Sequence, residues 1–265
     1  SDVYKRQGIA IFKNDWVNDK PIYFSLFNAY HSSVHKQSDD LSFVLTYGET
    51  DFFVDAGKYN FVEDDPYRIF IRSVFAHNTI SVDNKTYDFR EQSFIGNPTI
   101  DDYSIGLDFS YVKASHRLFE GVEITRTVFL FNEGAVYIHD SIKSDVSHSY
   151  SQIFNVGQDV ILDTNQSSNI SLTSIIDGSK INLIQLNKID AMSSFYGSLE
   201  PIRGWKSSTF NQVEPISSLN YYIDGDNVEF STCININIAI EQVEHNNGTY
   251  QFLFSNGSTI SVITN

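Results

Sequence analysis

Polar and apolar residues alternate with a period of two along most of this 265-residue chain. Segments 122–131, 180–186 and 228–240 carry β-branched or aromatic side chains at nearly every second position, as a strand with one buried face requires. Turn sequences separate such segments, among them Asn-Glu-Gly at 132–134 and Asn-Gly at 247–248. No segment shows a convincing amphipathic helix. More than a dozen short strands of this kind predict an all-β fold, a large antiparallel β-sandwich.

The chain contains no internal repeat, low-complexity tract or linker that would divide it. We expect residues 8–265 to form one domain, with 197–213 as the longest irregular connection. Residues 1–7 (SDVYKRQ) lack an initiator Met and resemble the translation of sequencing-adapter DNA. We therefore expect them to be a non-native leader.

Charge and composition narrow the classes of partner. The formal net charge of −15 argues against binding to nucleic acid or to an anionic membrane surface, both of which need a basic face. A single cysteine, Cys233, excludes a disulfide framework and a cysteine-based zinc site. No run of about 18 apolar residues predicts a membrane-spanning helix.

Four residues with ligand or acid/base chemistry stand out, namely His35, Gln37, Asp55 and His77. If residues 35–37 are extended, His35 and Gln37 project from the same face. Asp55 ends a predicted strand, and His77 opens the next one. Imidazole, carboxylate and amide oxygen are all ligands for zinc or a similar ion. A histidine at a strand end is, however, more often a hydrogen-bonding or surface residue, so the residues alone leave both interpretations open.

Three sequence blocks occur in series. They are HKQSDDLSF at 35–43, FFVDAG at 52–57 and RSVFAHNTISVD at 72–83. In order and spacing they resemble the C-terminal domain of the heparinase II/III-like polysaccharide lyases, whose signature is roughly His-x-His-x-Asp-x-x-Ser-Phe, then Val-Asp-Pro-Gly, then His-Asn-Thr-Val. The resemblance covers about residues 8–88, and Arg-Gly-Trp at 203–205 also fits the family pattern.

The resemblance implies one half of a two-part enzyme, in which an N-terminal α/α toroid, absent from this sequence, precedes the β-sandwich. The family cleaves uronate-containing glycans such as heparan sulfate or alginate by β-elimination. Its toroid supplies a Tyr acid/base and an Asn or His that neutralises the uronate carboxylate, and the sandwich adds a His. We therefore expect the isolated chain to be inactive.

Carried over residue by residue, His35 matches the sandwich histidine of the active site. Gln37, Asp55 and His77 match the residues that bind a divalent metal, zinc in the first place. Gln37 departs from the pattern, because many members have His at its position, and an amide weakens zinc binding. A metal here would organise loops and would not activate water, since elimination needs no water nucleophile.

An anionic uronate polysaccharide would be the partner of such a site, and a bacterial periplasmic or secreted location would suit it. The nearest cationic and phenolic groups for a carboxylate or sulfate are Lys36, Tyr67, Arg68 and Arg72. Alternatively, Arg72 pairs at the surface with Asp64 or Asp65, which we expect in a solvated loop at 64–66.

Two other classes of function remain open at this stage. A non-catalytic carbohydrate-binding or envelope-glycan assembly module would present a flat aromatic platform, with Trp205 and tyrosines as candidates. A purely structural sandwich would have no converging polar cluster. Convergence of His35, Gln37, Asp55 and His77 would favour the lyase hypothesis over both.

Overall fold

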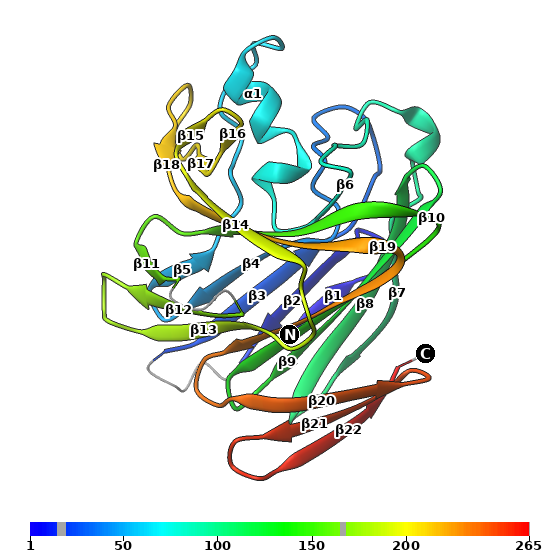
Figure 1. Cartoon of the computed structure of the whole chain (residues 1–265), viewed down its shortest axis with the longest axis vertical. Helices are drawn as coiled ribbons and strands as arrows, with labels where there is room; N and C mark the ends of the chain where they lie inside the picture. Colours follow the sequence, from blue (N-terminus) through cyan, green and yellow to red (C-terminus); the bar gives the residue numbers. More distant parts are fainter. Residues whose placement is uncertain (15–19, 165–167, 265) are drawn as a thin grey trace.

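The computed structural model describes residues 1–14, 20–164 and 168–264, and within these ranges most of the regular structure consists of antiparallel strands (Figure 1). The longest path through the main sheet runs, in order of pairing, through β1 (Asp2–Tyr4), β2 (Ile9–Lys13), β3 (Ile22–Phe27), β4 (Ser42–Tyr47), β5 (Thr50–Phe53), β10 (Ala135–Val156), β19 (Ser217–Asn235), β13 (Lys180–Gln185), β12 (Asn169–Ser174) and β11 (Val160–Asp163). The predicted all-β sandwich is confirmed.

The remaining elements attach to this path or form small sheets. β9 (Val122–Phe131) pairs with β10 and with β8 (Phe109–Phe119), β8 pairs with β7 (Thr99–Ile105), β6 (Ile80–Val82) pairs with β10, and β14 (Ala191–Tyr196) pairs with β19. Two-residue hairpins are formed by β15 (Ser198–Leu199) with β16 (Ile202–Arg203) and by β17 (Trp205–Lys206) with β18 (Glu214–Pro215). β20 (Ile240–Asn246), β21 (Thr249–Phe254) and β22 (Thr259–Ile263) form a separate three-stranded sheet.

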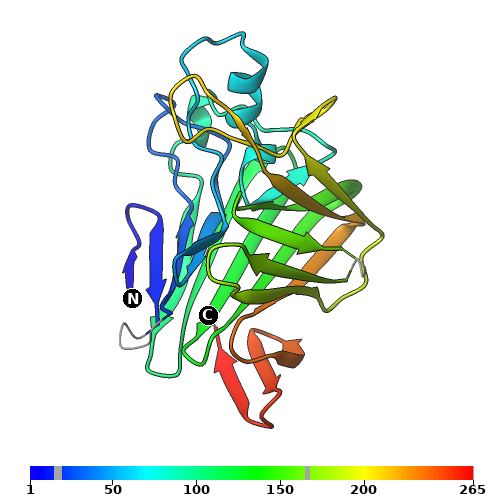
Figure 2. The same ribbon diagram turned by 90° about the vertical axis from the view of Figure 1, so that its left-hand side faces the viewer.

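Alternation along β9 explains how the chain builds two cores. Val128 and Leu130 belong to the main core between the layers of the sandwich, whereas Phe129 and Phe131 belong to a second core against β20–β22. Successive side chains of a strand point to opposite faces, so one strand serves both cores. The sheet β20–β22 lies at one end of the molecule and helix α1 (Pro66–Ile71) at the other (Figures 1 and 2).

The α1 end of the molecule carries the segments around Asp55 and His77. Here β5 ends, the 3₁₀ turn η1 (Val74–Ala76) leads into β6, and a third hydrophobic cluster packs beneath the helix. A second 3₁₀ turn, η2 (Gln92–Phe94), follows along the chain. Residues 64 and 65 lie in the expected loop before α1, whereas Pro66 is already in the first helical turn; the Asp65 side chain caps the helix by accepting hydrogen bonds from the Tyr67 and Arg68 N–H groups.

The structure also bears on the expectations for the segment 197–213 and for membrane-spanning helices. The segment 197–213 holds only two-residue strands, as an irregular connection would. Residues 2–4 pair with β2 as strand β1, which does not bear on the predicted non-native origin of residues 1–7; that origin stays a prediction. No helix in the described ranges is long and apolar enough to cross a membrane.

Candidate functional site

Asp55 follows strand β5 in a tight turn. Its Oδ1 accepts a 2.8 Å hydrogen bond from the N–H of Gly57, a local bond that aspartate makes readily in turns. Gly57 has a φ of 82°, and a Cβ there would lie 2.3 Å from the carbonyl oxygen of Ser207. Glycine is therefore required where this turn meets the 207 segment. The Ser207 N–H donates to the Ala56 carbonyl at 2.8 Å and fixes the contact.

His77 contacts Asp55 directly. It directly follows η1, is 1% exposed, and its Nδ1 lies 2.7 Å from Oδ2 of Asp55. Burial works to lower the pKa of His77, but the Asp55 carboxylate outweighs it and holds this pKa above its usual value. Burial likewise opposes ionisation of Asp55, yet His77 and the Gly57 N–H keep the pKa of Asp55 below its usual value. The two side chains therefore form a hydrogen-bonded histidine–carboxylate pair, in which each group favours the charged form of the other.

Gln37 reaches the same turn from another loop. Its Nε2 donates to the carbonyl oxygen of Gly57 at 3.3 Å. Two buried atoms, Oε1 of Gln37 and Nε2 of His77, have no hydrogen-bond partner among the described residues. Buried polar atoms are rarely left unpaired, and an ion or water is a common explanation. An imidazole, a carboxylate and a weaker amide oxygen are thus brought to the Gly57 turn, and these donor types can hold a divalent cation once His77 gives up its proton.

His35 does not share the environment of Gln37. Its φ is 61°, in the left-handed region, so the segment is not extended and the expected common face of His35 and Gln37 is wrong. His35 is exposed to solvent, whereas Gln37 turns inward to Gly57. The structure therefore joins Gln37, Asp55 and His77 and leaves His35 as an exposed imidazole two residues away along the chain.

The residue after His77 anchors this region to the sheet. The Asn78 side chain donates to the carbonyl groups of Phe43 and Val54 at 2.7 and 3.1 Å and accepts from the Asn155 N–H at 2.6 Å. These bonds join the ends of three segments, so the backbone that carries Asp55 and His77 is held on both sides.

A buried arginine supports Asn78 from below. Arg126 donates from Nη1 to the carbonyl oxygens of Asn78 and Leu41 at 2.6 Å each. Its Nε and Nη2 donate to the two carboxylate oxygens of Asp140 at 2.6 and 2.8 Å, and both side chains have an exposed fraction of 0%. Asp140 also accepts from Gln152 at 2.8 Å. The site thus rests on a buried, bidentate ion pair.

Lys36 lies inside the protein. It is 7% exposed, and its Nζ pairs with Asp39 and, at 2.8 Å, with Asp40. The Tyr87 hydroxyl donates to the same Asp40 carboxylate at 2.6 Å. Because two carboxylates already occupy this ammonium group, its placement favours a role in holding the loop over contact with substrate.

The two predicted arginines are also engaged internally. Arg68 is 5% exposed and donates to the Lys58 carbonyl at 2.9 Å. Arg72 is 7% exposed and donates to both carboxylate oxygens of Glu63 at 2.9 and 3.1 Å. The alternative pairing of Arg72 with Asp64 or Asp65 is therefore wrong in its partner, although the expected ion pair exists.

Tyr67 is half-buried and packs against Trp205, with ring centroids 5.4 Å apart and planes at 78°. Large apolar side chains in and just before α1, and Phe210, are exposed. Phe61 and Phe210, whose rings lie 6.1 Å apart, are 56% and 66% exposed, and Ile69 of α1 is 58% exposed. We call Phe61, Val62, Ile69 and Phe210 the apolar rim; such grouped exposed side chains typically mark an interface.

Sequence reasoning missed Arg126 and Asp140. The sequence held a signal for Arg126, because it alternates with Ile124 and Val128 on the buried face of a strand that is otherwise apolar there. A second polar group, His139, Glu229 and His245, is the only set of three His, Cys, Asp or Glu residues in the described ranges with metal-binding spacing. Its members are far apart in the sequence, and no local pattern announces them.

Solved structures of known proteins share the fold of this chain. A heparinase III gene product (TM-score 0.82, 16% identity) aligns with 98% of this chain, over 41% of the length of the heparinase. Heparan sulfate lyase HepC from Pedobacter heparinus (TM-score 0.79, 16% identity) aligns with 97% of this chain, over 41% of the length of the lyase. A further heparinase III structure (TM-score 0.79, 16% identity) aligns with 98% of this chain, over 42% of the length of that protein. Identities this low show the shared fold, and the chain spans about two fifths of the length of these proteins.

No curated protein matches the sequence. The family model described as "Heparinase II/III-like, C-terminal" matches residues 3–237, which include all three sequence blocks and every residue of the Gln37, Asp55 and His77 group. This chain therefore belongs to the heparinase II/III-like C-terminal domain family.

Proposed function

We propose that this chain is the sandwich part of a polysaccharide lyase that cleaves a uronate-containing glycan by β-elimination. The observation that carries the proposal is the polar group of Gln37, Asp55 and His77 beside the exposed His35, in a chain of this family. Because solved proteins of the same fold are named heparinase III or heparan sulfate lyase, heparan sulfate is the preferred substrate and alginate the second choice.

In such a reaction a base takes the proton from C5 of the uronate, the bond between C4 and O4 breaks, and O4 leaves with a proton. Negative charge develops on the uronate carboxylate as the C5–H bond breaks. His35 is exposed, so its ring N–H can donate to that charge or to the departing oxygen without rearrangement of the core. The base and the main neutralising group would come from the toroid.

Asp55 and His77, with Gln37 as a weak third donor, would hold a divalent cation, zinc by donor preference. Bound there, the metal would supply fixed positive charge behind the loop that carries His35. Gly57 links the Asp55 turn to Gln37, and Asn78 fixes the backbone after His77. These residues keep the loop in place, which favours a positioning role for the group.

A polyanionic substrate needs positive charge in the cleft. Lys36, Arg68 and Arg72 have exposed fractions of 7%, 5% and 7%, and each makes polar contacts inside the protein. Of the four predicted contacts, Tyr67 is therefore the one that we keep as a direct contact. We propose that most of the charge facing the glycan comes from the toroid.

The apolar rim supports a partner at the α1 end of the sandwich. Phe61 and Phe210 of this rim contact each other, and Ser207, close to Phe210 in the sequence, pairs with Gly57 beside Asp55. An N-terminal domain docked there would cover this surface and close the cleft over His35. A periplasmic or secreted bacterial enzyme would suit such a substrate.

The test is to join this chain to the upstream part of its reading frame and to assay heparan sulfate and alginate by the ultraviolet absorbance of the unsaturated uronate product. The joined protein should be active, its His35→Ala variant should lose about 10²-fold or more in kcat, and the present chain alone should be inactive. Equal activity of His35→Ala and wild type would refute the role of His35, and turnover by the present chain alone would refute the need for a toroid.

A non-catalytic carbohydrate-binding module is less well supported. It would need aromatic rings side by side in a flat row. Tyr67 and Trp205 instead pack edge to face, and the Trp205 Nε1–H donates to the Ser198 carbonyl at 2.8 Å. Their geometry suits packing of the 205 segment on α1.

A further inference from the structure

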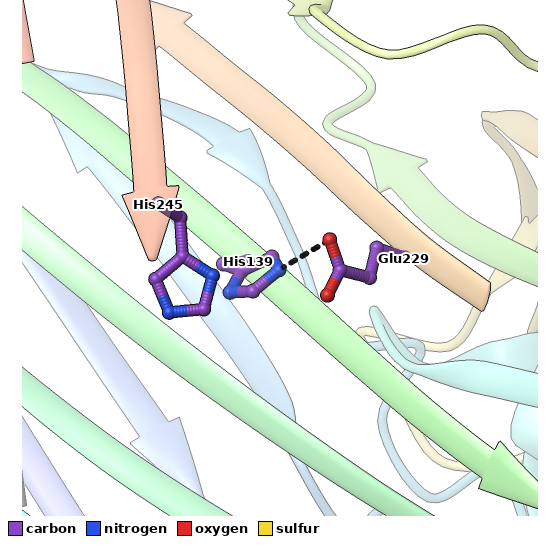
Figure 3. A group of neighbouring side chains, drawn as sticks. All are labelled: His139, Glu229 and His245. Atoms are coloured by element: carbon purple, nitrogen blue, oxygen red, sulfur yellow. Dashed lines mark ion pairs between the residues drawn. The ribbon is translucent and has the colours of Figure 1, made fainter. Parts of the chain in front are cut away.

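The sheet β20–β22 shares no strand pairing with the main sheet and rests on it through side chains. At one edge of this contact, His139 of β10, Glu229 of β19 and His245 of β20 lie together (Figure 3). One ligand atom from each lies within 4.8 Å of the other two. Three strands, two from one sheet and one from the other, thus meet at a group of two imidazoles and a carboxylate.

Strand register brings these side chains together. His139 pairs with Ser231 across β10 and β19, so Glu229 is its diagonal neighbour on the same face. In the other sheet, His245 lies directly opposite Tyr250. The two rings stack with centroids 4.1 Å apart and planes at 13°. The positions are therefore set by regular strand geometry and do not depend on a loop.

Tyr250 also sets the orientation of His139. The hydroxyl of Tyr250 lies 2.7 Å from Nδ1 of His139. When Nδ1–H donates to this hydroxyl, the lone pair of Nε2 faces Glu229. Such an outer hydrogen bond typically fixes the tautomer of a metal-binding histidine.

The spacing between His139 and Glu229 suits a shared ion better than a direct bond. Nε2 of His139 and Oε2 of Glu229 are 3.5 Å apart, longer than a good N–H···O hydrogen bond. Two ligand atoms on a tetrahedral zinc, with bonds of about 2.0–2.1 Å, lie roughly 3.3 Å apart. Glu229 and His245 are exposed and can close on an ion by rotating their side chains.

We propose that His139, Glu229 and His245 bind a transition-metal dication, zinc in the first place, which cross-links β20 to β10 and β19. Two imidazole nitrogens and one carboxylate oxygen match the donors that zinc takes, and the exposed side leaves a fourth position for water. Calcium and magnesium prefer six or more oxygen ligands and are excluded by the same donor set.

The charges around the group agree with a cation site. Glu229 brings a carboxylate to two imidazoles, and metal binding uses an ionised carboxylate and neutral imidazole rings. Lys113 lines the cavity of His139 and His245 and opposes a cation, so the negative charge of Glu229 is needed for affinity.

Calorimetric titration of tag-free protein with zinc chloride tests the proposal. Wild type should show a zinc site that His245→Ala and Glu229→Gln each remove or weaken by about 100-fold or more, while Tyr250→Phe weakens it by about tenfold. Both ligand variants lie at exposed positions and keep the core intact. His148→Ala is the matched control, because His148 lies on β10 like His139, is partly exposed and, among the described residues, forms an ion pair only with Asp83, with Nδ1 and Oδ2 2.8 Å apart. It should bind zinc as wild type does.

Titration of the Asp55→Ala variant separates this site from the one proposed at Asp55 and His77. Asp55→Ala should still bind zinc at the site that His245→Ala removes. Zinc should therefore raise the Tm of Asp55→Ala but not that of the double variant Asp55→Ala/His245→Ala. Calcium should neither bind at this site nor raise the Tm of Asp55→Ala. The proposal is overturned if wild type binds no zinc, or if His245→Ala and Glu229→Gln bind as much zinc as tightly as wild type. A loss of zinc in Asp55→Ala alone would instead support only the first site.

Discussion

The Asp55–His77 pair and the His139–Glu229–His245 group are built in opposite ways. Asp55 and His77 lie in turns at strand ends, within 22 positions of each other, and His77 is 1% exposed. His139, Glu229 and His245 lie within regular strands, and two of the three are exposed. The first group needs extra structure to hold its backbone, whereas the second inherits its geometry from strand register.

That difference appears in what surrounds each group. The backbone around His77 is fixed by Asn78, which in turn accepts from the buried Arg126. His139 needs only Tyr250 from the facing sheet. A polar site in turns therefore carries a polar network inside the core, and such networks are costly when they are incomplete. Substitutions should consequently damage the first group more than the second.

The largest effect should follow Arg126→Met. It leaves Asp140 buried without its cation and releases the carbonyl groups of Leu41 and Asn78, so we expect a loss of about 3–5 kcal/mol in the free energy of unfolding. Urea unfolding measures it. The control is Arg117→Met, whose ion pair with Glu123 is exposed and should be worth less than about 1 kcal/mol. Similar losses in the two variants would mean that the buried network of Arg126 contributes no more to stability than an exposed ion pair.

Gly57→Ala should be next. The new Cβ would meet the Ser207 carbonyl oxygen at 2.3 Å, and φ is 82°, so strain and overpacking together should cost about 3 kcal/mol. Gly121→Ala is matched in φ, at 72°, but opens onto free space, and should cost about 1 kcal/mol. Thermal unfolding compares them. Zinc binding at His139, Glu229 and His245 should not change in Gly57→Ala; a parallel loss there would mean that the two groups are coupled.

The sequence allowed more of the first group to be predicted than of the second. Period-two alternation predicted the strands, and the short blocks around Gln37, Asp55 and His77 placed three residues that the structure joins. The same reasoning failed for the face shared by His35 and Gln37, because it assumed an extended segment where His35 is left-handed. It assigned Lys36, Arg68 and Arg72 to substrate contact because they lie near His35 and His77 in the sequence, yet each has internal polar partners. His139 and Glu229 meet through a pairing of β10 with β19 across 90 positions, which no local pattern encodes.

The buried residue His116 gives the stability of the fold a pH dependence. It is 2% exposed, and burial, with the charges of Lys36 and Arg126, lowers its pKa to about 3. Unfolding returns it to its ordinary value of 6.5, so the unfolded chain binds the extra proton as the pH falls. Stability should therefore decrease below pH 6.5 by about 1.4 kcal/mol per pH unit from this residue. Urea unfolding at several pH values should show a shallower acid slope for His116→Gln; an unchanged slope would assign the dependence to other groups.

The smallest expected effect is the change in zinc affinity caused by Gln37→His, which tests the first group alone. Gln37→His replaces the amide that donates to Gly57 by an imidazole, the residue type that the family pattern has at this position. If Asp55 and His77 form a metal site weakened by Gln37, zinc affinity there should rise at least tenfold, or about 1.4 kcal/mol. A His245→Ala background silences the second group in the calorimetric titration. Gln212→His, at an exposed glutamine, is the control for an added imidazole and should leave affinity unchanged. An equal affinity in Gln37→His and its parent would mean that the Asp55–His77 pair holds the turn by its own ion pair, with no metal.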